Sequence, residues 1–490
     1  MDVLNKTIKK LNEQDFENLI LEIPGGEDSK PYAVLTAARN NNYSDSEMME
    51  MLKVNPSTYY TLKSRLKTKV AYILSKKVDN PISELMEEVA RVPATLYGTS
   101  KAVSIRALKD LEKQLIEYDL SNELIVVYET LARLNLYNEE YEKYDMLYSK
   151  HVAFSLAVTK AQKLFYSFIF RIGNYGLTGH EEDREELNDV RRKLNNIQEL
   201  YDSHRLFVLN NIVRIYHLSM TTEDVQELRS LEIEIENILK SINEIIQKYE
   251  LDTFYQKMKF IVDFLYYGYY VKTGNYVRAE HHYKKIIGEV PELSKHHVFN
   301  FYILSFLSDR VQHFIATGNS EILFAKNDEI LENLDIERDE IYHNTVFHQY
   351  QAICKHYKED HFGAAKMIND LRNEVSLRNF VKTDIECKLF QAMEYCIAGE
   401  EDLCVQLINS VNRQVKDMEG NSEHAKIFIK FIKAALKSTE FDKKVKRLKR
   451  LADEFNAENT GDNRMLTFIK LDEPFFKKLA SPFKYKYAAS

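Results

Sequence analysis

The chain is poor in residues that interrupt or cross-link a polypeptide. Tryptophan is absent from its 490 residues, glycine and proline number only 14 and 8, and cysteine occurs four times. Glycine and proline are the strongest helix breakers, so their scarcity favours long helical segments. Since 44% of the residues are hydrophobic and 29% are charged, the composition predicts an all-α fold.

The few cysteines do not indicate a disulfide framework or a metal site. They all lie in the last third of the chain and lack metal-ligand spacing: Cys354, Cys387, Cys396 and Cys404. Gly399 is expected to end a helix between the last two of them. We predict that all four are small buried hydrophobic residues in a reducing cytoplasm.

Long apolar runs are also missing. Residues 1–20 are amphipathic and contain acidic residues, which is unlike a signal peptide. No run of about 18 apolar residues occurs, so no membrane-spanning helix is expected. The sequence predicts a cytoplasmic protein without a membrane partner.

Motifs that carry catalysis are absent as well. The chain contains no phosphate-binding loop, dinucleotide-binding turn, nucleophile elbow or H-E-x-x-H zinc helix. Two metal ligands on one helical turn need a spacing of three or four, whereas His343 and His348 are five apart. The series continues with His356 and His361. We therefore expect no metal, no cofactor and no enzymatic activity, with catalytic residues dispersed along the chain as the alternative.

Residues 254–291 form the most specific stretch that is present. Its residue types recur at the spacings of a two-helix unit: Tyr270, Gly274, Tyr276, Ala279, Tyr283, Ile286 and Pro291. Gly274 is expected to end the first helix with a positive φ, Ala279 to allow close approach of the second helix, and Pro291 to stop it. This stretch resembles a tetratricopeptide repeat, and Ala365 and Cys404 mark weaker copies.

The resemblance implies an α-solenoid of stacked helix pairs that binds a protein or peptide. In such repeats the first helix of each pair lines a concave groove, and the corresponding residues are Ile261, Phe264, Gly268, Val271 and Lys272. Their apolar character favours an apolar or amphipathic segment as partner. The alternative is that Ile261 and Phe264 simply pack against a neighbouring helix.

A second informative stretch lies near the N-terminus. Residues 32–39 are expected to form a short helix, Ser44 to cap a helix over 46–52, and Ser57 to cap a long helix that reaches Lys77. The string EMMEMLKVNPSTYYTLKSRLKTKV (47–70) resembles the helix-turn-helix of sigma-factor region 4 and of response-regulator output domains. In that fold the recognition helix lies in the major groove.

The net charge of −8 and the pI near 6.0 do not predict nucleic-acid binding, so a basic face has to be local. Residues 57–77 contain six basic and no acidic residues. By the resemblance, the residues that face DNA are Ser57, Thr58, Tyr60, Lys63 and Ser64, with Arg65 and Lys67 beside them. Lys53 stands where the turn usually has glycine. The alternative is a solvated basic helix in a helical cap or protein-docking module.

Proline and glycine residues divide the chain into segments. We expect a helical head over 1–78, a joint over 79–98 between Pro81 and Pro93, and the repeat domain over 99–440. Within the repeat domain, Gly173 to Gly179 are expected to mark a turn. Residues 441–490 hold a basic helix and a tail. We interpret the helix as a solvated capping helix, and the alternative is that it contacts a membrane or nucleic acid.

Two functions are compatible with these features. The first is a non-enzymatic adaptor whose solenoid binds a protein or peptide. The alternative is a DNA-binding regulator whose solenoid senses a peptide or protein, as in peptide-responsive bacterial regulators with an N-terminal helix-turn-helix. The face of 57–77 discriminates between them: it should be open in a regulator and covered in an adaptor.

Overall fold

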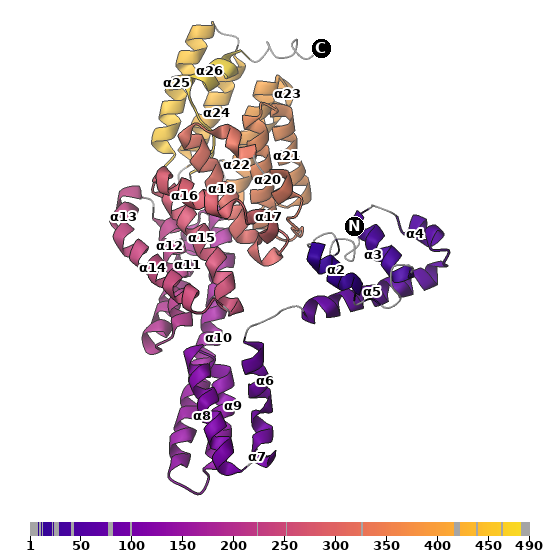
Figure 1. The fold of residues 1–490 in the computed structure, drawn as a ribbon. Helices are drawn as coiled ribbons and strands as arrows, with labels where there is room; N and C mark the ends of the chain where they lie inside the picture. Colours follow the sequence, from indigo (N-terminus) through magenta and orange to yellow (C-terminus); the bar gives the residue numbers. More distant parts are fainter. Residues whose placement is uncertain are drawn as a thin grey trace. The chain divides into compact units, whose positions relative to one another are not determined.

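The computed structural model describes residues 8, 11, 13–21, 23, 29–40, 44–76, 82–98, 100–222, 224–250, 252–324, 327–415, 422–437, 440–461 and 464–481. Over these ranges the secondary structure is helical, without a β-strand (Figure 1). The prediction of an all-α protein is confirmed. The chain divides into two compact units, residues 1–87 and residues 88–490, which we call the N-terminal and C-terminal units.

The N-terminal unit is built from short helices and one long helix. They are α2 (Glu13–Leu21), α3 (Lys30–Asn40), α4 (Asp45–Met51) and α5 (Pro56–Lys76). One small hydrophobic core holds them together, with Leu19, Leu35, Met48, Tyr59 and Leu66 among its buried residues. The helix α6 (Ser83–Arg91) crosses the boundary between the two units.

The C-terminal unit is a succession of helices in which neighbours along the chain pack side by side (Figure 1). Its first elements are η1 (Val92–Ala94), α7 (Thr95–Gly98), α8 (Lys101–Glu117), α9 (Ser121–Leu134), α10 (Glu140–Thr178), α11 (Glu181–Leu200), α12 (His204–Thr221), α13 (Val225–Ser230) and α14 (Glu232–Lys248). Then follow α15 (Thr253–Lys272), α16 (Tyr276–Ile286), α17 (Val290–Leu293), η2 (His297–Phe299), α18 (Asn300–Thr317), η3 (Ser320–Phe324), α19 (Asn327–Leu331) and α20 (Ile341–Tyr357). The last are α21 (His361–Glu374), α22 (Val381–Ala398), α23 (Glu401–Gln414), α24 (Glu423–Leu436), α25 (Phe441–Glu458) and α26 (Glu473–Ala480).

Four helix hairpins of this unit share one turn. Each first helix ends in a residue with positive φ: Asp119 (55°), Gly274 (72°), Glu359 (64°) and Gly399 (78°). In each, the next N–H donates to the carbonyl five residues back at 2.9 Å, as Asn275 does to Tyr270. This hydrogen bond closes a Schellman motif and satisfies a carbonyl at the helix end. The prediction that Gly274 ends its helix with a positive φ is confirmed.

The same hairpins bury side chains at equal distances from the turn. Five, nine and twelve residues after the residue with positive φ, the buried sets are Leu124, Tyr128 and Leu131; Ala279, Tyr283 and Ile286; Ala364, Ile368 and Leu371; and Cys404, Ile408 and Val411. The residue equivalent to Ala279 is therefore Ala364, and the assignment of Ala365 was wrong by one residue. This repeat has no glycine at the turn, because Glu359 takes the position of positive φ.

Two other boundary predictions need correction. Helix α16 already ends at Ile286, and Pro291 lies in the first turn of the next helix, α17. Backbone N–H groups in a first turn have no acceptor within the helix, so proline costs no hydrogen bond there. Gly173 and Gly176 lie inside the 39-residue helix α10, which ends only at Gly179, where φ is 65°. A Cβ on Gly173 would lie 3.0 Å from Cγ of Tyr342, so this glycine allows α20 to approach α10.

The apolar residues of the C-terminal unit form two clusters, one running from Phe154 to Cys354 and the other from Ala352 to Leu479. All four cysteines are free and buried, which confirms their prediction as core residues. The basic helix α25 buries Leu448 and Leu451 and packs against α24. No helix in the described ranges has the length and apolarity needed to cross a membrane.

Candidate nucleic-acid interface

Helix α4 begins at a capping box. Ser44 Oγ accepts a hydrogen bond from the Glu47 N–H at 3.4 Å, and the Ser44 N–H donates to Glu47 Oε2 at 2.7 Å. The hydrogen bonds from Ser44 lower the pKa of the Glu47 carboxyl. Ser44 is thus the N-cap that the sequence predicts, and two backbone donors at the helix start are satisfied.

The turn between α4 and α5 uses a lysine in the left-handed conformation. Lys53 has a φ of 48°, and the Val54 N–H donates to the Met49 carbonyl at 3.1 Å. Helix α5 is capped by Asn55, whose Oδ1 accepts from the Thr58 N–H at 2.8 Å. The predicted cap at Ser57 was wrong because Pro56, with its preset φ and no N–H, starts the helix one residue earlier.

Helix α5 has one core face and one open face. Tyr59, Leu66 and Val70 are buried in the core of the N-terminal unit. The exposed positions include most of the predicted DNA-facing residues: Ser57, Thr58, Tyr60, Ser64, Arg65 and Lys67. The sequence of α5 contains no acidic residue, so this face presents hydroxyl groups and positive charge. We call these six residues the open face of α5.

Lys63 does not belong to this face, so its prediction as a DNA-facing residue is corrected. Its Nζ lies 2.6 Å from Asp45 Oδ1, and only 13% of its side chain is exposed. Tyr59 donates its hydroxyl to the same oxygen at 3.1 Å. Lys63 is four residues after Tyr59 and therefore follows it toward α4, where Asp45 accepts both groups.

The groove predicted on α15 is filled by protein. Ile261, Phe264 and Val271 are buried, with 0%, 5% and 3% of their surface exposed. The Phe264 ring lies 5.7 Å from the Phe306 ring of α18. These residues therefore pack against a neighbouring helix, which was the alternative interpretation.

The other two predicted groove residues, Gly268 and Lys272, are half-buried. A Cβ on Gly268 would lie 2.7 Å from Asp309 Oδ2, so this glycine leaves room for the carboxylate of Asp309. The positive charge of Lys272 acts on the same carboxylate. Both residues thus lie beside a half-buried acidic group of α18.

Exposed apolar side chains lie instead on α10. Leu156, Tyr166 and Phe170 are 68%, 58% and 70% exposed. Lys257 Nζ of α15 lies 5.4 Å from the centre of the Tyr166 ring, which is within range of a cation–π interaction. Sequence reasoning missed this surface because α10 lacks the repeat pattern. The available signal was the presence of large apolar residues on the polar side of a long helix.

Three residues that the sequence left apart come together in the C-terminal unit. His356 of α20 and His361 of α21 direct Nδ1 to the two oxygens of Glu394 of α22, each at 2.7 Å. The rule that histidines five residues apart cannot share a site holds only within one continuous helix. Here α20 ends at Tyr357 and α21 begins at His361, so the turn brings both imidazoles to one carboxylate.

Comparisons of the chain with protein-family models, with curated proteins and with solved structures each return no match.

Proposed function

We propose that the protein is a DNA-binding regulator whose N-terminal unit binds duplex DNA through α5. The observation that carries the proposal is the open face of α5, which is exposed, free of acidic residues and presented by a helix that follows α4 after a tight turn. Since the same helix buries its opposite side in the core, it is held rigidly for insertion into the major groove. An adaptor that used this helix for packing would instead cover the face.

In this proposal, different residues of the open face contact the phosphates and the base edges of the duplex. Arg65 and Lys67 supply positive charge for phosphate oxygens, which dominate affinity and its salt dependence. Ser57 and Thr58 stand at the N-terminal end of α5, the part of a recognition helix that contacts base edges. In this proposal the C-terminal unit is a tetratricopeptide-like array that senses a protein or peptide, and no reaction or cofactor is assigned to the chain.

The test is a titration of a fluorescently labelled mixed-sequence duplex with the full chain, followed by anisotropy at several salt concentrations. We expect log affinity to fall linearly with log salt. The double variant Arg65→Ala/Lys67→Ala should bind at least about tenfold more weakly at about 50 mM salt, with a salt slope smaller by about 2, because each lost phosphate contact removes about 0.9.

Lys443→Ala/Lys446→Ala is the matched control, since it removes two exposed lysines from α25. It should bind the duplex like the wild type. Absence of binding at low salt, or equal loss in both double variants, would show that α5 does not contact DNA.

A second candidate function, that of an adaptor for a protein or peptide, is favoured by the exposed apolar residues of α10. Tyr166 and Phe170 are four residues apart, so they lie on one side of the helix, and Lys257 stands beside Tyr166. Exposed aromatic residues next to a positive charge suit an amphipathic segment with an acidic side chain.

The adaptor function predicts a partner that depends on this surface. In quantitative affinity capture from cells, at least one protein should bind the wild type and be lost at least about tenfold from Tyr166→Ser/Phe170→Ser, as expected for truncated aromatic hot spots. Val277→Ser, which changes a side chain 85% exposed on α16, should retain it. If no captured protein distinguishes the two variants, α10 is not the docking surface.

A further inference from the structure

The cluster of His356, His361 and Glu394 contains a carboxylate in an unusual setting. Glu394 has no exposed surface, yet its two oxygens face two imidazoles and not a lysine or arginine. A buried carboxylate that stays charged needs partners that hold positive charge.

The three side chains are also arranged for chelation. One potential ligand atom from each residue lies within 4.8 Å of those of the other two. Bonds of about 2.0–2.2 Å to nitrogen and oxygen place tetrahedral ligands about 3.3 Å apart, so the hydrogen-bonded pair at 2.7 Å that contains the ligand oxygen needs to open by only a fraction of an ångström. The ligands come from three successive helices, α20, α21 and α22, whose backbones fix their positions.

A cavity next to the cluster provides access and further donors. It measures about 580 Å³, and both histidines line it together with Glu359, Asp472 and Tyr357. Among the described residues, His361 Nε2 is buried without a hydrogen-bond partner. Since Nδ1 faces Glu394, this nitrogen is left to carry the ring proton when an ion binds at Nδ1.

We propose that His356, His361 and Glu394 bind one divalent transition-metal ion of the Zn²⁺ class, with the adjacent cavity supplying the fourth ligand. Two imidazole nitrogens and one carboxylate oxygen are donors that Zn²⁺ accepts, and three protein ligands leave one position open. Each imidazole binds through the nitrogen that faces Glu394, so its proton there is transferred to the other ring nitrogen or released to solvent when the ion enters.

The ion would join the α20–α21 hairpin to α22. Binding only to the folded state stabilises it by mass action. The site is thus a staple between consecutive hairpins of the C-terminal unit and is independent of DNA binding by α5.

The experiment uses the full chain, stripped with a chelator and dialysed, then titrated with Zn²⁺ and, separately, with Co²⁺. We expect about one ion per chain, a rise in the melting temperature with Zn²⁺, and visible d–d absorption of Co²⁺ with nitrogen and oxygen ligands. Glu394→Gln and His361→Ala should each weaken binding by at least about tenfold, which is the minimum seen when even an outer-shell partner is lost.

Matched controls exist on the same helices. His348 of α20 is 8% exposed, as is His356, but it bonds to the Asn344 carbonyl, and His348→Ala should bind Zn²⁺ like the wild type. Glu386→Gln on α22 should do the same. The Co²⁺ spectrum and X-ray absorption of the wild type keep the test decisive if Glu394→Gln fails to fold. A folded wild type that binds neither ion, or binding unchanged by His361→Ala and His356→Ala, would overturn the proposal.

Discussion

Replacement of Arg310 by alanine is expected to destabilise the C-terminal unit by about 3–5 kcal/mol, because three hydrogen bonds from a charged donor are lost and a cavity opens in the core. Arg310 lies on α18 with no exposed surface. Its Nη1 donates to Asn327 Oδ1 at 3.0 Å and to the Tyr350 hydroxyl at 3.1 Å. Its Nη2 donates to the Ile322 carbonyl at 2.7 Å.

These acceptors belong to α19, α20 and η3, so one guanidinium joins three elements to α18. Alanine would remove one donor from each acceptor, although Asn327 Oδ1 would keep the Tyr350 hydroxyl, and would open a cavity where the side chain was. The loss should appear in urea unfolding followed by circular dichroism, as a lower midpoint.

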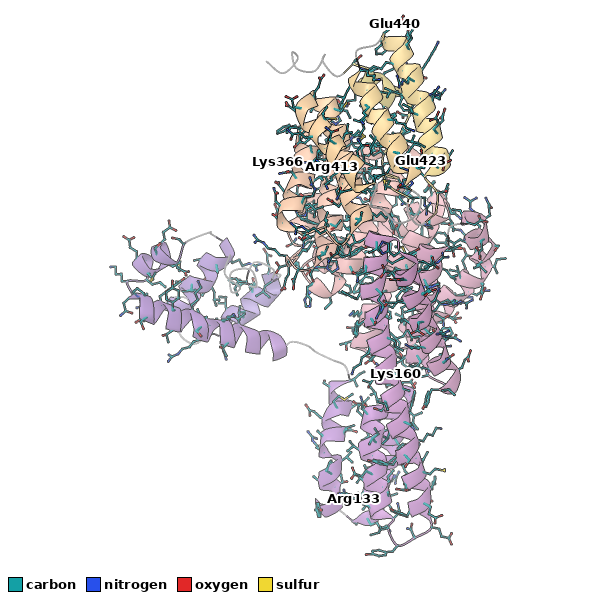
Figure 2. The ribbon with its side chains drawn as sticks, turned by 180° about the vertical axis from the view of Figure 1, so that it is seen from behind. Arg133, Lys160, Lys366, Arg413, Glu423 and Glu440 are labelled. Carbon is teal, nitrogen blue, oxygen red and sulfur yellow. The ribbon has the colours of Figure 1, made fainter. Side chains whose placement is uncertain are left out.

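Arg133→Ala is the control for Arg310→Ala. Arg133 lies on the surface of α9 (Figure 2), with 62% of its side chain exposed and Glu129 as its ion-pair partner. An exposed i,i+4 pair contributes about 0.3–0.5 kcal/mol. Equal midpoints for the two variants would mean that the Arg310 network does not stabilise the unit.

Asp309→Asn is expected to remove a pH dependence of stability. Burial raises the pKa of Asp309 to about 7, although Lys272 acts to lower it. An unfolded aspartate has a pKa of about 3.9. Between these values the folded protein holds a proton that the unfolded chain has released, so the stabilisation present below about pH 4 is lost as the pH rises through 7.

The shift of about three units corresponds to at most about 4 kcal/mol, at 1.36 kcal/mol per unit. Tyr216, Tyr267 and Tyr342 also face Asp309, and their own pKa values are raised above 10, so they stay neutral in this range. Asparagine is uncharged at every pH, and the variant should therefore be more stable than the wild type at pH 8.

The measurement is the urea midpoint of both proteins at about pH 5.5 and pH 8. The wild type should lose stability between the two values, and Asp309→Asn should lose markedly less. Asp110→Asn, at an exposed carboxylate on α8, should follow the wild type. The same loss in Asp309→Asn as in the wild type would show that another group carries the pH dependence.

The sequence determined those features that depend on local chemistry. Scarce glycine and proline imply the helices. Ser44 with Glu47 three residues later implies the capping box, and Gly274 implies a turn with positive φ. The open face of α5 was expected from the resemblance to a helix-turn-helix, together with the absence of acidic residues from 57–77.

Tertiary structure decided the features that depend on a second helix. Lys63 turns away from the open face because Asp45 lies on α4. Gly173 lies inside a helix and does not end it, because the glycine is there to leave space for the ring of Tyr342 on α20. Neither partner is visible in a local window of sequence. Asp119 and Glu359 adopt positive φ without being glycine, since the packing of the hairpins outweighs the modest cost of that conformation for a single residue.

The position of a second helix also decided the outcome for the predicted groove and for the histidine cluster. Apolar residues at helical spacing, such as Ile261 and Phe264, have the same pattern whether they line a groove or fill a core, and only the position of α18 determines which. His356, His361 and Glu394 lie far apart by the rules for one helix. The turn after α20 and the packing of α22 bring them together, because side-chain clusters are set by the distances between helices and not by spacing along the chain.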